Sequence, residues 1–128
     1  MGKPHSKPPP IKKFDHITIE VSDLQAALAF YSDILGLFPM TMPAELADQG
    51  ICWLDLGKGD VLHLVENPGA RPGKTAHIAI EVQDLQAWKD YLATRKVQMF
   101  PPKLDLYRAA RVFILDPSGN RIELIRWL

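Results

Sequence analysis

Two stretches of the chain, HITIEVSDLQA at residues 16–26 and HIAIEVQDLQA at residues 77–87, are nearly the same. Nine of the eleven aligned positions are identical, and the two copies start 61 positions apart. In each copy apolar residues first alternate with polar ones and then recur at helical spacing, which predicts a strand followed by a helix. A strand–helix unit that occurs twice in one chain predicts a fold built from two similar modules.

The sequence around the two copies predicts where their elements begin and end. Ser22 or Asp23 can cap the first helix and Asp84 the second, while Gly36 fits the position just past the first helix. GKGD and DPSGN are typical of turns between strands. Further strands are expected at residues 37–42, 50–56 and 61–66 in the first half, and at 97–100, 111–115 and 121–126 in the second. The sequence therefore predicts an α+β chain of two βαβββ modules.

The domain organisation follows from the same pattern. Residues 14–66 form the first module, residues 67–75 a linker rich in proline and glycine, and residues 76–128 the second module. Residues 1–13 contain four lysines, four prolines and no acidic residue, which predicts a flexible basic arm.

The composition limits the classes of function. Hydrophobic residues make up 47% of the 128 residues, enough for a substantial core. A formal net charge of zero argues against a nucleic-acid-binding protein that depends on a positive field. No apolar run approaches the roughly 20 residues that span a membrane. The single cysteine, Cys52, excludes an internal disulfide, and we expect a reducing, cytoplasmic setting.

The ends of the two halves also match, at an offset of 60 positions. GDVLHLVE at 59–66 aligns with GNRIELIR at 119–126, and this alignment puts His63 opposite Glu123. With His16 and His77, each half then has one ligand-type residue on its first strand and one on its last. Imidazole and carboxylate donors suit zinc, nickel, iron, manganese or cobalt. The alternatives are that these histidines pack as ordinary strand residues, or that a one-residue shift turns His63 to the other face.

The motifs FDHITIEVSDLQAALAFYSDILGL and DPSGNRIELI, within this repeated module, resemble the vicinal oxygen chelate superfamily over residues 12–128. That superfamily includes glyoxalase I, fosfomycin-resistance thiol transferases, extradiol dioxygenases, methylmalonyl-CoA epimerase and bleomycin-resistance binding proteins. The resemblance implies mixed sheets that curl around a divalent metal, which binds neighbouring oxygens of a small-molecule substrate. It also implies a homodimer, with modules paired either within one chain or between two. The metal ligands it implies are His16, His63, His77 and Glu123.

The resemblance favours a glyoxalase-like enzyme that moves a proton in an isomerase or lyase reaction, with Glu123 or His63 as the ligand that also carries the proton. An extradiol dioxygenase, a thiol transferase and a metal-free binding protein of the bleomycin-resistance type remain open. Two positions differ from glyoxalase I itself, which resembles this chain but has arginine where Glu20 stands and glutamate where His63 stands. Glu20 and its repeat equivalent Glu81 would face the carboxylates of glutathione.

Other residues are candidates for contact with the substrate. Trp53 lies on the strand before the GKGD turn, and residues 101–113 are expected to form a long loop over the mouth of the site. Tyr107, Arg108 and Arg111 in that segment could bind an anionic or oxygen-rich molecule. Cys52 is expected to pack within its strand.

Overall fold

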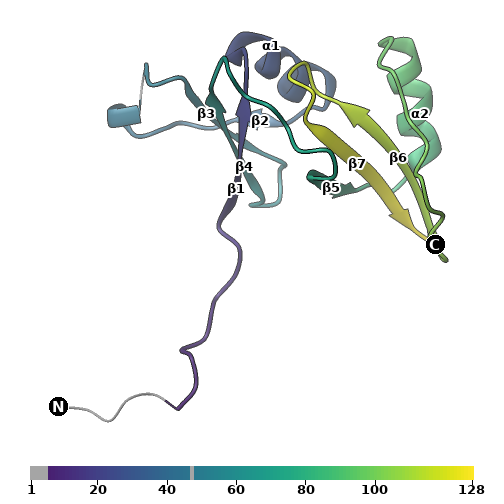
Figure 1. Ribbon diagram of the computed structural model, residues 1–128, viewed down its shortest axis with the longest axis horizontal. Coiled ribbons are helices and arrows are strands. Elements are labelled where there is room, and N and C mark those ends of the chain that lie inside the picture. The colour runs from purple at the N-terminus through teal and green to yellow at the C-terminus, as the bar shows by residue number, and fades with distance from the viewer. Residues whose placement is uncertain (1–5, 47) are drawn as a thin grey trace.

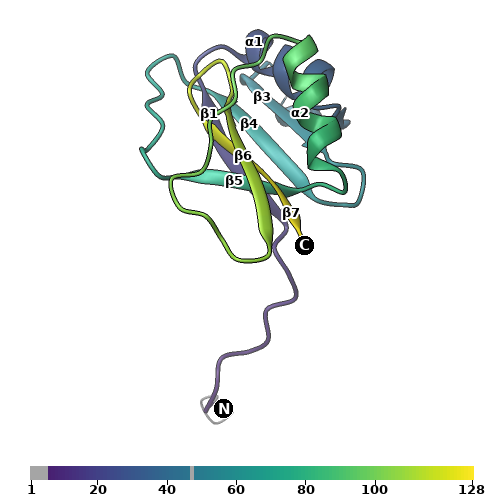
Figure 2. The ribbon, with the colours of Figure 1, turned by 90° about the vertical axis from the view of Figure 1, so that its right-hand side faces the viewer.

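The computed structural model describes residues 6–46 and 48–128. Part of the predicted arm, residues 1–5, lies outside the described residues. Residues 6–15 contain no helix or strand, and they extend away from the two modules (Figures 1 and 2). Within the described residues, no helix is long and apolar enough to cross a membrane.

The first module contains a four-stranded mixed sheet in the order β1-β4-β3-β2. β1 runs parallel to β4, and the other two pairings are antiparallel. The predicted strand at 37–42 is reduced to two residues, one of which is Pro39, and proline cannot donate a ladder hydrogen bond. The strands are β1 (His16–Val21), β2 (Phe38–Pro39), β3 (Ile51–Asp55) and β4 (Val61–Glu66), and a short 3-10 helix, η2 (Ala44–Leu46), lies between β2 and β3.

The second module contains a three-stranded sheet in the order β5-β7-β6, with β5 parallel to β7. The expected strand at 97–100 is absent, and only Phe100 forms an isolated bridge, to Phe113. Pro101 and Pro102 follow this bridge, and their lack of N–H groups prevents its extension. The elements are β5 (His77–Glu81), α2 (Leu85–Thr94), β6 (Ala109–Leu115) and β7 (Arg121–Trp127). The α+β class with two mixed sheets is confirmed.

The helices begin where the sequence predicts. Asp23 accepts a hydrogen bond from the Ala26 backbone N–H at 3.1 Å, and Asp84 accepts one from Ala87 at 3.0 Å. The first helix, α1 (Leu24–Leu28), continues as a π-helix, η1 (Ala29–Ile34), a wider winding that the apolar spacing does not reveal. Gly36 follows it with a φ of +79°, a conformation that glycine adopts without strain.

The apolar core lies on the helix-facing side of both sheets. The buried residues of β4 and β6 alternate along each strand, as a sheet covered on one face requires, whereas β7 is buried at four consecutive residues, 122–125. Figures 1 and 2 show α2 alongside β6 and β7 of the second sheet. The fully or almost fully buried core residues of these strands are Leu62, Leu64, Val112, Ile114, Ile122 and Leu124.

The DPSGN turn between β6 and β7 connects the two modules. Asp116, which is 4% exposed, accepts a 2.7 Å hydrogen bond from the hydroxyl of the fully buried Tyr31 in the first module. The Ser118 side chain accepts a 2.8 Å hydrogen bond from the Ser22 backbone N–H, and Asn120 donates to the Glu20 carbonyl at 2.8 Å. The two modules are thus held together by one buried polar contact, Tyr31 with Asp116, and by two that are less buried.

Candidate functional site

The register of the two parallel ladders puts His63 and Glu123 in equivalent places. Thr18 of β1 pairs with His63 of β4, and Ala79 of β5 pairs with Glu123 of β7. Thr18 and Ala79 are repeat equivalents, so the offset of 60 between the final strands is present in the structure. Both side chains lie on the sheet face opposite the helices, because their strand neighbours are buried in the core.

His16 and His63 form a stacked pair on the first sheet. Their ring centroids are 3.9 Å apart with an interplanar angle of 16°. The ring of Trp53 also stacks on His63, with centroids 4.4 Å apart. The Nδ1 of His16 lies 2.8 Å from a carboxylate oxygen of Asp15. Since the carboxylate can only accept, Nδ1 carries the proton and donates it, which leaves the lone pair on Nε2. The same contact lowers the pKa of Asp15.

The stacked environment changes the titration of His63. Partial burial lowers its pKa, the neighbouring His16 lowers it further, and Asp15 acts in the opposite direction. A lowered pKa keeps the imidazole neutral, the form that can bind a metal or accept a proton.

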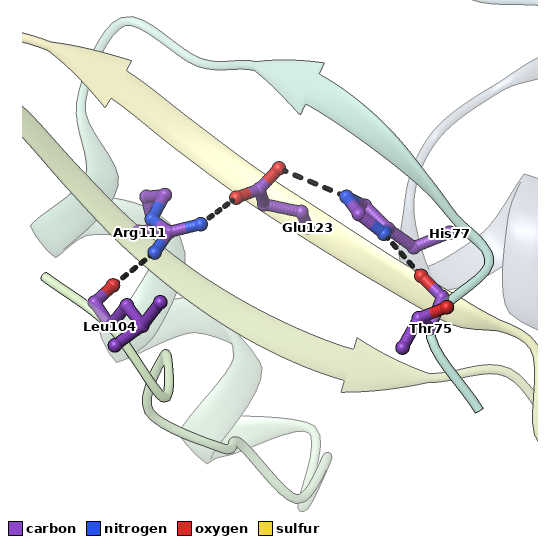
Figure 3. Close-up of polar contacts among 5 residues, drawn as sticks. All are labelled: Thr75, His77, Leu104, Arg111 and Glu123. Atoms are coloured by element: carbon purple, nitrogen blue, oxygen red, sulfur yellow. Dashed lines mark hydrogen bonds and ion pairs between the residues drawn. The ribbon is translucent and has the colours of Figure 1, made fainter. Parts of the chain in front are cut away.

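His77 and Glu123 form the corresponding pair on the second sheet (Figure 3). The Nε2 of His77 lies 3.5 Å from Oε2 of Glu123, while its Nδ1 lies 2.8 Å from the carbonyl oxygen of Thr75. The carbonyl can only accept, so Nδ1 again carries a proton, and Nε2 is the ring nitrogen that faces the carboxylate. Glu123 is 5% exposed, and a buried carboxylate requires a partner.

Arg111 of β6 is that partner. One guanidinium nitrogen donates to Oε1 of Glu123 at 2.7 Å, and another donates to the carbonyl of Leu104 in the loop after Phe100. Figure 3 shows the resulting chain of contacts from Leu104 through Arg111 and Glu123 to His77 and Thr75. One carboxylate oxygen is therefore occupied by Arg111, and the other is directed to His77. This ion pair with Glu123 is a role that the sequence did not indicate for Arg111.

The four predicted ligands do not converge within one chain. The structure brings them together as two pairs, His16 with His63 and His77 with Glu123. Across residues 6–46 and 48–128, no three His, Cys, Asp or Glu side chains form a group that could hold a metal ion. Each pair supplies two nitrogen or oxygen donors, which is half of a four-coordinate site.

The remaining candidates are divided between the site and its surroundings. Trp53 lies against His63, as described, and Arg111 lies at Glu123. Tyr107 is 86% exposed, and Arg108 lies over its ring with the guanidinium carbon 5.4 Å from the centroid. The structure does not bring Tyr107 or Arg108 to either pair. Asp15 and Thr75 orient the two first-strand histidines. Asp15 directly precedes β1, and Thr75 lies two residues before β5. This closeness in sequence to His16 and His77 is the signal from which their role could have been predicted.

Cys52 lies on β3 with its side chain partly buried, and burial raises the pKa of its thiol. A raised pKa favours the unreactive thiol over the thiolate, which fits the packing role expected of it.

Comparison with protein families gives a match over nearly the whole chain. The family model described as the Glyoxalase/Bleomycin resistance protein/Dioxygenase superfamily matches residues 13–124. Among curated proteins, an uncharacterized protein of Escherichia coli, YaeR, is 30% identical over 89% of this chain and 95% of its own length. The metallothiol transferase FosB of Staphylococcus epidermidis is 26% identical, covering 89% of this chain and 81% of that protein.

Solved structures share the fold. A glyoxalase family protein from Bacillus anthracis superimposes with a TM-score of 0.85 at 26% identity, over 95% of this chain and all of that one. The antibiotic-binding protein TnmS3 from Streptomyces gives a TM-score of 0.73 at 24% identity, over 92% of this chain and 98% of that one.

Proposed function

Because the chain belongs to the glyoxalase/bleomycin resistance protein/dioxygenase superfamily, we propose that it is a divalent-metal-dependent enzyme that acts on a small molecule. The observation that carries the proposal is the state of the two first-strand histidines. His16 and His77 each donate Nδ1–H to a neighbouring acceptor, so Nε2 of each is the ring nitrogen left to bind a metal. Oriented imidazoles of this kind, with a carboxylate beside one of them, fit zinc, nickel, iron, manganese or cobalt.

The complete site forms between two copies of the chain. Each copy presents one half of the donor set on each of two sheet faces, and the two halves remain separate within the copy. In a twofold dimer, the His16–His63 face of one chain would lie against the His77–Glu123 face of the other, and the symmetry would generate two equivalent sites. The homodimer and the shared site are parts of this proposal.

The chain's own residues determine which steps are available. A bound divalent metal supplies Lewis acid chemistry, which polarises an oxygen of the substrate. His63 is kept neutral by its surroundings and can accept a proton at a ring nitrogen. Glu123, by contrast, has one oxygen held by Arg111, which suits a fixed ligand better than a mobile base. Proton transfer in an isomerase or lyase reaction would therefore use His63.

A thiol transfer is the second candidate, and the same contact of Glu123 favours it. Glu123, fixed by Arg111, would keep a bound metal in place to activate an electrophile, and it would not itself have to carry the proton that passes from the thiol to the oxygen released from the substrate. The relatives include both classes: FosB is named a metallothiol transferase, and a Synechocystis relative at 29% identity is named a probable lactoylglutathione lyase. Glu20, which alternation places on the same face of β1 as His16, accepts a hydrogen bond from Asn67, and its negative charge disfavours glutathione as the thiol.

Metal analysis combined with subunit complementation tests the proposal. Protein purified without chelators is expected to bind one of these metals at micromolar concentration or tighter. His16→Ala and Glu123→Gln should each lose the metal, and mixing the two variants after partial unfolding should restore about a quarter of the sites, because each mixed dimer contains one intact site. Absence of metal from the unaltered protein would contradict the enzyme and favour a metal-free binding protein. Metal binding without complementation would contradict the shared site.

A further inference from the structure

A hollow of about 560 Å³ lies beside His77 on the second module. Three cationic side chains line it, Lys103, Arg111 and Arg121, and no carboxylate does. The other lining residues are mostly apolar and include Phe113. The hollow is in the size range of small-ligand sites, and its combination of cations and apolar surface is typical of a site for an organic anion.

The two arginines of the hollow differ in what they contact. The guanidinium carbons of Arg111 and Arg121 lie 5.7 and 5.8 Å from the centroid of the Phe113 ring, so both are held by the same aromatic side chain. Arg111 also donates to Glu123 and to Leu104. Arg121, in the part of the chain that the structure describes, forms no ion pair with a carboxylate. One guanidinium is thus committed to the candidate metal ligand, and the other is available.

The ladder register places Arg121 next to the candidate metal ligand His77. Arg121 of β7 pairs directly with His77 of β5, and it precedes Glu123 by two residues on the same face of its strand. The ring of His77 also meets Phe113 edge-on, with centroids 5.7 Å apart. A ligand group bound to Arg121 would therefore lie next to the donors of the second pair.

We propose that Arg121, together with Lys103, binds an oxyanion of the substrate, so that the substrate of this enzyme is a small organic acid with a carboxylate, phosphonate or phosphate group. A guanidinium presents a planar set of donors that matches two oxygens of such a group. The apolar wall from Phe113 then contacts the carbon portion of the molecule. That the bound anion is part of a substrate rests on the proposed function. Binding of the anion itself requires no metal.

Titration of the metal-free full-length chain tests this site. In buffer with EDTA, methylphosphonate, acetate and the neutral acetamide are added while the ring resonances of His77 are followed by NMR. Methylphosphonate or acetate should shift His77 with saturation, and acetamide should not. Strong binding of methylphosphonate alone would assign a phosphonate or phosphate group to the substrate, and binding of acetate alone a carboxylate. Equal effects of acetate and acetamide would overturn the proposal.

Arg126 provides a matched control for Arg121. It lies on the same strand, is exposed, and alternation of side chains places it on the opposite face. Arg121→Gln should weaken binding of the anion by about 10-fold or more, the loss expected when one charge-assisted hydrogen bond is removed. Arg126→Gln should change it less than about twofold, and Arg121→Lys should keep part of the affinity. Unchanged binding in Arg121→Gln, with a thermal midpoint equal to that of the parent, would overturn the proposal.

These results separate the oxyanion site from the metal enzyme. Arg121-dependent binding of methylphosphonate by a protein that takes up no metal would support the site and contradict the enzyme. Metal uptake without anion binding would contradict the site alone.

Discussion

The two sheet faces share one strand framework, yet they hold their candidate ligands by different means. On the first face, His16 and His63 are held by ring stacking and by Asp15, whose side chain is 87% exposed. On the second face, Glu123 and Arg111 form an ion pair whose side chains are 7% and 13% exposed. The first pair can adjust its position, whereas the second is fixed by a network from Leu104 to Thr75 whose central ion pair is buried.

This difference indicates that the two modules have different roles in the proposed site. A rigid pair sets the position of a metal before the substrate arrives, and an adjustable, neutral imidazole is suited to a step that moves a proton. Gene duplication alone would leave two equal faces. The contrast between the charged, buried face and the stacked, exposed face is therefore open to direct tests.

The largest expected effect is on stability. Arg111→Ala leaves Glu123 buried without its cation, and loss of one partner of a buried pair costs about 3 kcal/mol or more in the free energy of unfolding. Asp15→Ala, which removes the carboxylate partner of His16 on the other face, should leave stability unchanged, because that pair is exposed. Urea unfolding of both variants provides the comparison, and equal losses would show that the two faces do not differ in this respect.

Metal affinity is the next test of the comparison. Glu123→Gln keeps the shape of the side chain and removes its charge, and it should weaken zinc binding by more than about 100-fold, beyond the loss typical of outer-shell partners. His63→Gln should weaken it less, because its ring is held only by stacking. Competition with a chelator of known affinity measures both. A larger loss in His63→Gln would reverse the assignment of the rigid half of the site.

The sequence predicted much of the framework and little of this contrast. The repeat in residues 16–26 and 77–87 is local, so most of the strands, both helix caps and the register that makes His63 equivalent to Glu123 could be anticipated from spacing, whereas the strands expected at 37–42 and 97–100 were largely wrong. The pairing of Arg111 with Glu123 could not, because it depends on how far a long side chain reaches diagonally between two strands. The separation of the His16–His63 pair from the His77–Glu123 pair depends on how the modules pack, which no periodicity encodes.

The contact between the modules should show a third, smaller effect. Tyr31→Phe removes the hydroxyl that donates to the buried Asp116, at a cost of about 1 to 2 kcal/mol. Burial and the adjacent Asp116 raise the pKa of Tyr31 above its ordinary value of 10. Above pH 10 the unfolded tyrosine therefore loses a proton that the folded one keeps, and stability falls by up to about 1.4 kcal/mol per pH unit.

Tyr91→Phe is the control for that measurement. It also removes one hydroxyl hydrogen bond, to the Ile34 carbonyl at 2.8 Å, but leaves Tyr31 and Asp116 in place. Stability measured between pH 8 and 11 should show a shallower alkaline decline in Tyr31→Phe than in the parent or in Tyr91→Phe. Identical declines in all three would mean that Tyr31 ionises as freely in the folded protein as in the unfolded one.

The smallest effect concerns the adjustable half of the site, and its sign is more informative than its size. The pKa of His63 should lie below 6.5 in the metal-free protein, mainly because of its partial burial. Trp53→Leu removes the ring stacked on it and should raise this pKa, whereas Asp15→Asn removes a charge that favours protonation and should lower it further. NMR titration of the imidazole resonances follows both. Shifts of the His63 pKa in the same direction would contradict the opposite effects expected of Trp53 and Asp15. The assignment of His63 as the neutral base of the first face would then be wrong.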